Sequence, residues 1–385
     1  MIEKVIFIFL ILISVIYAIM MLRYSLAWIS VKEISNLQSA ICNLQSSVSI
    51  VIAARNEENN ISNCINDIIK QNYPKELFEI IIVDDASTDN TVNSIEKIIL
   101  KNSDCKINLL KLKDDTTISA HKKRAISEGI KNATRELIIT TDADCRMNEN
   151  WLSSIISFYE KNNCKMIIAP VQFLKSGNIF QKFQQLEFTG LIGITAAAAF
   201  LNEPIMCNGA NLLYEKNAFN SLNGFESSEN KASGDDVFLM LKFKKEFSAG
   251  AIKFIKSKDA IVWTSAKSSV SEFISQRKRW ASKSTNYNDF STTIVALIVF
   301  LTNISIVVSI VLLFINPVFI GVCFTVFGIK CVVDFIFFLS ISKFFGIRNL
   351  LWVVIPEQLL YIFYVAIIAT IAPFGSYEWK GRRVK

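Results

Sequence analysis

The sequence predicts an α/β protein with a mostly parallel, doubly wound sheet and several membrane-spanning helices. Three observations lead to this fold class. Short apolar runs alternate with segments of helical hydrophobic spacing, acidic pairs follow two of those runs, and long apolar stretches lie near both ends of the chain. The 385-residue chain is 51% hydrophobic and only 19% charged, so it is more apolar than a typical soluble protein.

Strands and helices alternate through the first half of the chain. The nearly continuous apolar run "VSIVIAA", residues 48–54, is typical of a strand covered on both faces. Further strands are expected at "EIIIV", "INLLKL", "ELIITT" and "KMIIAPVQF". Helical spacing marks the segments between them: residues 61–69, 92–99, 120–133 and 151–159. In such a sheet, ligands bind outside the carboxyl ends of the strands.

Four apolar stretches are long enough to cross a bilayer. The first, residues 5–22, runs for about 18 residues without a charge, and Arg23 follows it without a clear cleavage site, so we expect a retained anchor. The other three stretches are residues 294–315, 318–341 and 350–372. We therefore expect an anchor and linker at residues 1–46, a soluble domain with interfacial helices at 47–290, and membrane helices with a basic tail at 291–385.

The orientation of the last stretches stays open. If the central domain is cytoplasmic, three full spans place the tail outside, although its basic residues favour the inside. Those basic residues are Lys380, Arg382, Arg383 and Lys385. One stretch could instead be re-entrant or interfacial, because the last two contain Lys330, Asp334, Pro356, Glu357 and Gln358.

Composition limits the compartment and the partners. The eight cysteines form no CxxC pair, and the single histidine, His121, leaves no Cys/His set for zinc. Scattered cysteines suit a reducing compartment, so we expect the central domain in the cytoplasm. The net charge of +7 comes without an aromatic-rich basic motif, so it favours an anionic membrane surface over nucleic acid. No GxGxxG or GxxxxGK[ST] follows the first strand, which weighs against a dinucleotide oxidoreductase or a P-loop nucleotidase.

Two acidic pairs end predicted strands. In "TTDADC", Asp142 and Asp144 could have a structural role, in a solvated loop or as a helix cap. Alternatively, they hold Mg²⁺ or Mn²⁺, which would bind substrate phosphates and stabilise a diphosphate leaving group. In "VDDASTD", Asp84 and Asp85 either cap the next helix or bind a nucleoside through its imide nitrogen or ribose hydroxyls, a role for which we favour Asp85.

Two later motifs have similar alternatives. Asp235 and Asp236 precede an apolar helical run, where they either stabilise the helix terminus or supply a general base for an acceptor hydroxyl. "QRKRW", residues 276–280, is either a basic interfacial patch or a diphosphate site, with Trp280 on a sugar face. Residues 180–200 are predicted to lie along the interface or to form a buried core helix.

These four motifs, in this order over residues 48–280, resemble family 2 glycosyltransferases, the membrane-anchored branch with a Rossmann-like GT-A catalytic domain. The resemblance implies that Asp85 contacts the nucleoside and that Asp142 and Asp144 bind the metal and the diphosphate. It implies Asp235 as the base, with Asp236 as a rival because Gly234 replaces the common glutamate. The residues that would close the donor and acceptor site are Gln276, Arg279 and Trp280.

Other positions are assigned by the same resemblance. The nucleotide-sugar site would also include Ala54, Arg55, Glu57, Asp84, Lys122 and Ala143. The loop "MCNGAN" would touch the acceptor through Asn208 and Gly209, or is an ordinary glycine turn. Relatives often have Gly-Lys where this chain has His121-Lys122, which leaves the phosphate role of Lys122 open, and we expect a solvated His121.

The expected activity is inverting, metal-dependent transfer of a sugar from a nucleotide sugar, a UDP-sugar, to a hydroxyl of a membrane lipid at the cytoplasmic face of the cell membrane. The tail "WKGRRVK" resembles the ceramide glucosyltransferase-like group. A processive polysaccharide synthase of the same family is the alternative, although four apolar stretches are few for a polymer channel. A non-enzymatic membrane interaction or transport protein, with Lys330 and Asp334 on its path, is the alternative from another class.

Overall fold

The computed structural model describes residues 2–34, 44–115, 120–175, 177–226, 234–284, 289–371, 377–379 and 382–384. The chain forms two compact units. The helical unit comprises Met1–Val31, Lys175–Ala198 and Lys267–Gly375, and the sheet unit comprises Lys32–Leu174, Ala199–Ala266 and Ser376–Lys385. The units interleave along the chain, whereas the domains expected from the sequence are consecutive. Part of the expected linker (35–43) and part of the basic tail, including Lys380 and Lys385, lie outside the described residues.

The sheet unit is built on a seven-stranded sheet of order β3-β2-β1-β4-β8-β6-β9. Its strands are β1 (Val48–Ala54), β2 (Phe78–Asp85), β3 (Ile107–Leu112), β4 (Leu137–Asp142), β6 (Met166–Ile168), β8 (Leu212–Glu215) and β9 (Ile252–Phe254). Strands β3, β2, β1 and β4 are parallel, and β8 runs antiparallel to both β4 and β6. The predicted mostly parallel α/β sheet is confirmed.

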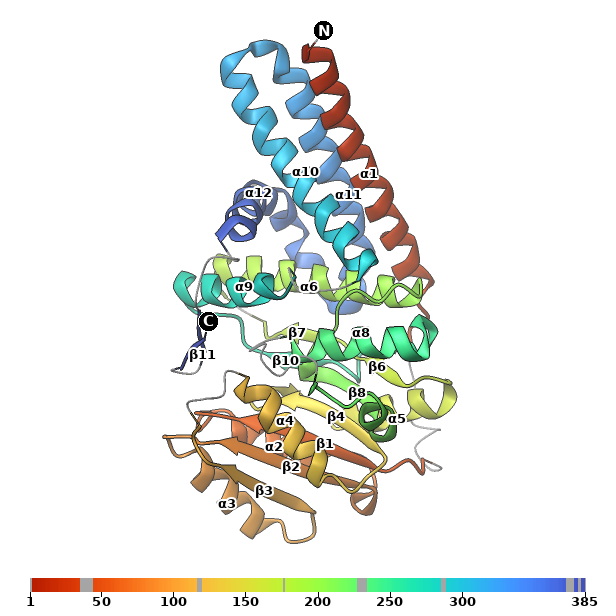
Figure 1. Ribbon diagram of the computed structural model, residues 1–385, viewed down its shortest axis with the longest axis vertical. Coiled ribbons are helices and arrows are strands. Elements are labelled where there is room, and N and C mark those ends of the chain that lie inside the picture. The colour runs from red at the N-terminus through yellow and green to blue at the C-terminus, as the bar shows by residue number, and fades with distance from the viewer. Residues whose placement is uncertain are drawn as a thin grey trace. The chain divides into compact units, whose positions relative to one another are not determined.

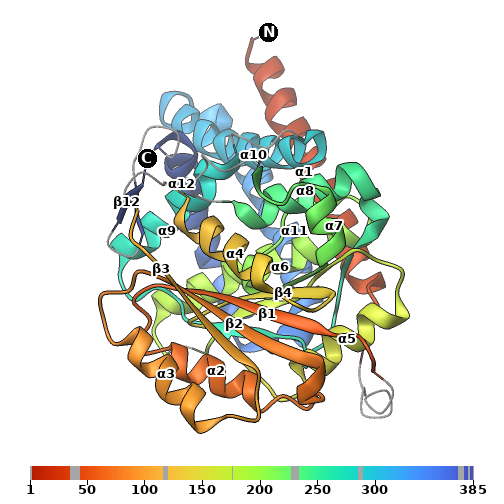
Figure 2. The ribbon, with the colours of Figure 1, turned by 60° about the horizontal axis from the view of Figure 1, so that its bottom comes forward.

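Helices cover both faces of this sheet. Figure 2 shows α2 (Ile61–Ile69) and α3 (Thr91–Lys101) on one face and α4 (His121–Asn132) on the other. Every residue of β2 is buried, which explains why its central residues, Ile80–Val83, form a continuous apolar run instead of alternating with polar residues. Helix α4 packs closely on β1 at Gly129, where a Cβ atom would lie 2.5 Å from Val51 Cγ1. The remaining helices of the unit are α5 (Trp151–Lys161), α7 (Lys216–Ser221) and α8 (Asp235–Phe247).

The segment "KMIIAPVQF" was expected to form one strand, and this prediction is wrong. Its first part is β6 in the large sheet, and its second part is β7 (Val171–Phe173) in a three-stranded sheet of order β5-β10-β7. The other two strands of that sheet are β5 (Arg146–Met147) and β10 (Val262–Thr264). Pro170 separates the two parts and has no N–H with which to continue a ladder, so the chain changes sheets there.

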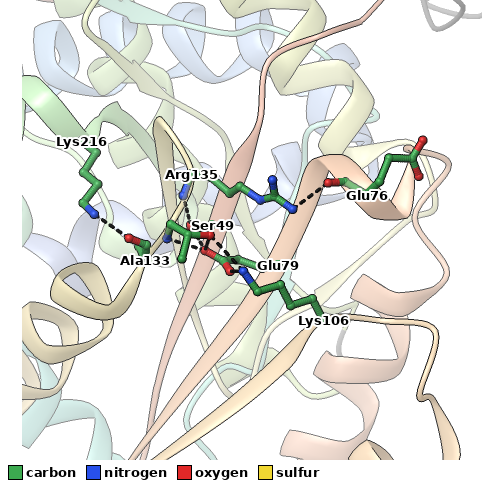
Figure 3. Close-up of polar contacts among 8 residues, drawn as sticks. Ser49, Glu76, Glu79, Lys106, Ala133, Arg135 and Lys216 are labelled. Carbon is green, nitrogen blue, oxygen red and sulfur yellow. Dashed lines mark hydrogen bonds and ion pairs between the residues drawn. The ribbon is translucent and has the colours of Figure 1, made fainter.

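A buried polar network closes the amino ends of the parallel strands (Figure 3). Glu79 Oε1 accepts hydrogen bonds from Ser49 Oγ at 2.6 Å and from the Thr134 N–H at 2.6 Å, and its Oε2 lies 2.5 Å from Lys106 Nζ. Burial alone would raise the pKa of Glu79, but the hydrogen bonds from Lys106, Ser49 and Thr134 outweigh it and lower the pKa to about 2. The charged carboxylate therefore joins β1, β2 and the loop before β4.

Among its described residues, the helical unit contains four segments long and apolar enough to cross a membrane: Glu3–Ser30, Phe290–Ile315, Pro317–Phe345 and Arg348–Ile368. Its helices are α1 (Ile2–Ser30), α6 (Ile179–Phe200), α9 (Val270–Ser284), α10 (Phe290–Ile315), α11 (Ile320–Phe345) and α12 (Val354–Ile371). In Figure 1, α1 runs alongside α10 and α11, while α6 and α9 run across the direction of these three. The expected set of one N-terminal and three C-terminal apolar helices is confirmed.

Small residues and one polar cluster position these helices. A Cβ atom at Gly190 of α6 would lie 3.0 Å from Phe338 Cζ of α11, so α6 approaches α11 closely. Inside the unit, Lys330 Nζ lies 2.5 Å from both Asp334 Oδ2 and Gln358 Oε1. The Tyr17 hydroxyl donates to Asp334 Oδ1 at 2.6 Å. Lys330 and Asp334 therefore neutralise each other and join α1, α11 and α12.

Candidate active site

The register of the parallel strands brings the acidic motifs to one edge of the sheet. Ala54, at the end of β1, pairs with Asp84 of β2, and Ala53 pairs with Asp142 of β4. Because β1 lies between β2 and β4, the two acidic motifs flank its carboxyl end. The sequence-based expectation that the two pairs end adjacent parallel strands thus matches the topology.

The loops after β1 and β2 are interlocked. Arg55 Nη1 donates to the backbone oxygens of Asp85 at 2.5 Å and Ala86 at 2.8 Å. The Asn56 N–H donates to Ser87 Oγ at 3.0 Å, and both Asn56 and Ala86 adopt left-handed backbone conformations (φ 51° and 55°). That conformation is uncommon for non-glycine residues other than Asn, so at Ala86 it reflects the contacts of the surrounding loop. Arg55 therefore holds the loop that carries Asp85.

Two carboxylates of this edge are buried. Asp84 Oδ2 accepts a hydrogen bond from the Ser87 N–H at 3.1 Å, whereas Asp84 Oδ1 is buried and has no hydrogen-bond partner among the described residues. Asp85 Oδ1 lies 3.7 Å from His121 Nδ1. His121 is only 6% exposed, so the expectation of a solvated histidine is wrong. The reason is that the first residue of α4 packs against the end of β2 beside Asp85.

Lys122 lies among carboxylates from two elements. Its Nζ lies 2.6 Å from Asp142 Oδ1. Burial would lower the pKa of Lys122, but the negative charges of Asp142, Asp235 and Asp236 outweigh it and raise the pKa above its usual value. The side chain is therefore protonated and positively charged at neutral pH. The ammonium group thus contacts the carboxylate at the end of β4 and interacts electrostatically with the two acids at the start of α8.

Asp144 has partners that the sequence did not indicate. Its Oδ2 accepts a hydrogen bond from Thr264 Oγ1 of β10 at 3.2 Å. Burial, together with the charges of Asp142 and Asp144, raises the pKa of the neighbouring Cys145 thiol. That thiol stays protonated and does not act as a soft thiolate ligand. Thr264 lies more than a hundred residues further along the chain in no recognisable motif, so only the fold shows its contact with Asp144.

The donor set suits a hard divalent cation with open coordination positions. Asp142 and Asp144 offer carboxylate oxygens, which Mg²⁺ and Mn²⁺ prefer. Within the described part of the chain, no cluster of three or more His, Cys, Asp or Glu side chains could hold a metal. Since Mg²⁺ usually keeps waters and substrate phosphates as ligands, two carboxylates fit such a cation when a phosphate-bearing substrate completes the shell.

The two acids at the start of α8 have different environments. Asp236 Oδ2 accepts a hydrogen bond from the Gly209 N–H at 3.1 Å, and Asp236 Oδ1 accepts one from its neighbour Val237 N–H at 2.8 Å. The carboxylate of Asp235 has no hydrogen bond to any described residue and is 9% exposed. A Cβ atom added to Gly209 would lie 3.8 Å from Asp235 Oδ2. The loop with Asn208 and Gly209 thus contacts this acidic pair, and its Asn208 side chain accepts from the Ala210 N–H.

The motif "QRKRW" lies on α9 in the helical unit. Arg277 is 3% exposed and binds Glu187 of α6, with Nη2 and Oε2 2.5 Å apart. Its Nη1 donates to Gln276 Oε1 at 2.6 Å, and its guanidinium carbon lies 4.2 Å from the centre of the Trp280 ring. The guanidinium of Arg277 thus neutralises a buried glutamate, so the diphosphate alternative for this motif depends on its other basic residues, Lys278 and Arg279. Gln276 and Trp280 are positioned by this pair, and Arg279 lies one helical step before Trp280.

Comparison with known proteins identifies the family. Residues 49–222 match glycosyl transferase family 2, and residues 137–374, more than half of the chain, match glycosyl transferase family group 2. The poly-beta-1,6-N-acetyl-D-glucosamine synthase of Staphylococcus epidermidis is 25% identical over 236 residues, which are 61% of this chain and 53% of that relative. The chain thus spans about half the length of this curated relative.

Two further similarities support the assignment. A dolichyl N-acetyl-alpha-D-glucosaminyl phosphate 3-beta-D-2,3-diacetamido-2,3-dideoxy-beta-D-glucuronosyltransferase of Methanococcus voltae is 33% identical over 114 residues, 30% of this chain and 34% of that protein. Among solved structures, the mannosyltransferase PcManGT from Pyrobaculum calidifontis, in complex with GDP-Man and Mn²⁺, matches with a TM-score of 0.58 and 15% identity over 95% of this chain and 98% of that one. This likeness concerns the fold.

The doubly wound sheet with acidic residues at the carboxyl ends of its strands defines a GT-A catalytic domain. The chain belongs to glycosyl transferase family group 2 and contains a glycosyl transferase family 2 domain.

Proposed function

We propose that the protein transfers a sugar from a nucleotide sugar, a UDP-sugar, to a hydroxyl group of a membrane lipid at the cytoplasmic face, using Mg²⁺ or Mn²⁺. The observation that carries this proposal is the position of Lys122 among the carboxylates of β4 and α8. A group that binds the diphosphate and a base that activates the acceptor must lie within one sugar of each other. The contact of Lys122 with Asp142, and the electrostatic effect of Asp235 and Asp236 on the same ammonium group, support that arrangement.

The donor binds, in this proposal, to the loops after β1 and β2. Asp85, held by Arg55 through its backbone oxygen, receives the nucleoside, with Ala54, Glu57 and Asp84 around it. The unpartnered Asp84 Oδ1 offers an acceptor for a ribose or base donor group. Interlocked loops reduce the conformational entropy lost on binding, so they favour a preorganised nucleoside site.

The diphosphate lies beside the end of β4, next to Ala143 and Lys122. Asp142 and Asp144 are the residues that would hold the metal, which when bound supplies positive charge to the leaving diphosphate. Gln276, Arg279 and Trp280 are proposed to close the site over the donor and the acceptor. The buried pair of Arg277 with Glu187 supports this role, because it fixes the helix that carries them.

Asp235 is the proposed base. Its carboxylate takes the proton of the acceptor hydroxyl while that oxygen forms a bond to the anomeric carbon. The bond from this carbon to the diphosphate oxygen breaks, and its electron pair leaves with the diphosphate. Attack opposite the leaving group inverts the configuration. Asn208 and Gly209, which contact the start of α8, are proposed to position the acceptor.

The lipid acceptor is supported by the helical unit, whose four long apolar segments would place the chain in a bilayer. The tail that resembles the ceramide glucosyltransferase-like group supports the same acceptor class. A processive polysaccharide synthase is the second candidate, favoured by the similarity to the Staphylococcus epidermidis synthase.

Mass spectrometry of lipids and polymers tests this proposal. Cells that express the chain should contain lipids heavier by one sugar, and these should be absent with the Asp142→Ala/Asp144→Ala variant. Purified protein with Mn²⁺ and UDP-sugars should modify extracted membrane lipids and not oligosaccharide primers. Extension of the primers to long products would replace the lipid proposal with the polymer alternative, and no turnover with any nucleotide sugar would contradict both.

A further inference from the structure

The ion pair between Lys122 and Asp142 lies where the metal and the diphosphate are proposed to bind. The two side chains are 25% and 35% exposed, and Nζ and Oδ1 are 2.6 Å apart. Partly exposed pairs of this kind interact more strongly than fully exposed ones, whose contribution is usually small, and less strongly than buried ones. Lys122 is thus a substantial counter-charge to the carboxylates that end β4 and begin α8.

On the basis of the proposed function, we propose that Lys122 is an internal counter-cation that competes with the divalent cation for Asp142. This competition makes the binding of the cation and the binding of the nucleotide sugar depend on each other.

Competition arises from the geometry of the carboxylate. Oδ1 of Asp142 accepts the Lys122 ammonium, and a metal ligand oxygen must approach Mg²⁺ to about 2.1 Å. An ammonium and a divalent cation placed on the same oxygen would repel each other at close range. Binding of a metal at this oxygen therefore requires Lys122 to leave it, and the cost of breaking the pair lowers the metal affinity.

Dependence on the donor arises from where the displaced ammonium can go. Lysine carries a compact charge with three donors on a flexible stem, so Lys122 can turn to a new anion without movement of α4. A diphosphate beside Asp142 supplies that anion and also supplies ligands to the metal. The free energy needed to separate Lys122 from Asp142 is then shared between the metal and the diphosphate. Each ligand therefore strengthens the binding of the other, which means that the two sites are positively coupled.

The pair also explains how acids from β4 and α8 are tolerated together before any substrate is present. Like charges in a partly buried site raise one another's energy unless a cation lies between them. Lys122 supplies this cation from within the chain, since Asp142, Asp235 and Asp236 all act on its ammonium group.

Electron paramagnetic resonance of Mn²⁺ tests the proposal with a readout other than activity. The detergent-solubilised full chain is titrated with Mn²⁺, with and without UDP, as wild type, Lys122→Met, Lys122→Arg and Asp142→Ala. Lys122→Met should bind Mn²⁺ about tenfold more tightly than wild type without UDP, as expected for loss of a partly screened positive charge. UDP should strengthen Mn²⁺ binding in wild type and much less in Lys122→Met, and Lys122→Arg should behave like wild type.

A matched control is Lys75→Met, because Lys75 pairs with Asp104 at the surface of the same unit. It should leave Mn²⁺ binding unchanged. If Lys122→Met unfolds at the same temperature as wild type but binds Mn²⁺ equally or more weakly, the proposed role of Lys122 is overturned. The metal site itself is still supported in that case if wild type binds Mn²⁺ and Asp142→Ala does not. If wild type binds neither Mn²⁺ nor UDP, or binds Mn²⁺ equally in Asp142→Ala, the metal-dependent function itself fails.

Discussion

At the scale of single residues, the two acids at the start of α8 differ in what they contact. Asp236 accepts hydrogen bonds from two backbone N–H groups, which fix it in the loop contact with Gly209. Asp235 makes no hydrogen bond to the described residues, so its carboxylate can accept a proton from a substrate hydroxyl. This difference in environment supports the proposal that Asp235, and not Asp236, is the base.

Replacement of Asp235 by Asn should therefore lower the turnover by about 10²- to 10⁴-fold while UDP-sugar binding persists, because loss of a general base affects the chemical step. Turnover with a lipid extract and calorimetric binding of the donor measure the two effects. Asp236→Asn is the matched comparison and should lower thermal stability as well as turnover, since it weakens two backbone contacts. Normal turnover in Asp235→Asn would assign the base elsewhere.

Glu79 gives a pH-dependent prediction. Its pKa is lowered from 4.5 to about 2 in the folded protein, so its charged form stabilises the fold above about pH 4.5, and this stabilisation disappears as the pH falls toward 2. Glu79→Gln should lower the stability at pH 7 by about 2 kcal/mol, and the difference from wild type should shrink below pH 4.5.

Thermal unfolding of both proteins in detergent between pH 7 and pH 3 measures this difference. Glu96→Gln is the control, because Glu96 forms a half-exposed pair with Lys111 and should change little at any pH. A difference for Glu79→Gln that stayed constant with pH would show that its charge is not what stabilises the network.

Site residues could be predicted from the sequence where a local sequence pattern indicates their position in the fold. Acidic pairs after apolar runs gave Asp84, Asp85, Asp142 and Asp144 their positions at the sheet edge. The buried state of His121 and the pairing of Arg277 with Glu187 depend on partners far away in the sequence, 36 and 90 residues apart respectively. No local pattern specifies such partners, so the sequence predicted the residues and not their contacts.

At the scale of elements, strands buried on both faces were the easiest to predict. The first strand was expected and found at Val48–Ala54, because continuous apolar sequence leaves few alternatives there. The division of "KMIIAPVQF" between two sheets was missed, since the apolar residues on both sides of Pro170 hide the change. Apolar pattern identifies strands, but the sheet that a short strand joins depends on packing.

The polar cluster of α1, α11 and α12 gives a prediction at this scale. Lys330→Met should destabilise the helical unit by about 3–5 kcal/mol, because it leaves the buried Asp334 carboxylate without its cation. Lys330→Met/Asp334→Leu should recover most of that loss, because no unpaired buried charge remains. Thermal unfolding in detergent measures both, and a double variant no more stable than the single one would contradict a structural role for the pair.

At the scale of the whole molecule, the sequence predicted the numbers of apolar helices and the type of sheet, but it treated the domains as consecutive. The helical unit takes residues 175–198 from the middle of the chain, between β7 and β8 of the sheet unit. Helices α6 and α9 are less apolar than membrane spans, so hydropathy alone assigns them to the soluble domain. Their assignment to the helical unit comes from contacts such as Phe273 with Tyr364, whose ring centres are 5.4 Å apart.

Removal of the last three apolar helices should leave the rest of the helical unit uncovered. A chain that ends at residue 289 keeps α1, α6 and α9, with the ion pair between α6 and α9, but loses the contacts that these three helices make with α11 and α12. Trp28 of α1 packs on Phe344 and Phe345, and Gly190 of α6 lies against Phe338. The exposed apolar faces should make the fragment associate, because such surfaces seek other apolar partners.

Size-exclusion chromatography in mild detergent compares this fragment with the full chain. We expect a single symmetric peak with UDP binding for the full chain, and mixed oligomers for the fragment. If the domains are instead consecutive, with a boundary after residue 290, the opposite result is expected. The fragment would then be monodisperse and would bind UDP as the full chain does. Such a result would mean that the sheet unit does not need α10–α12, and that α6 and α9 are covered in some other way.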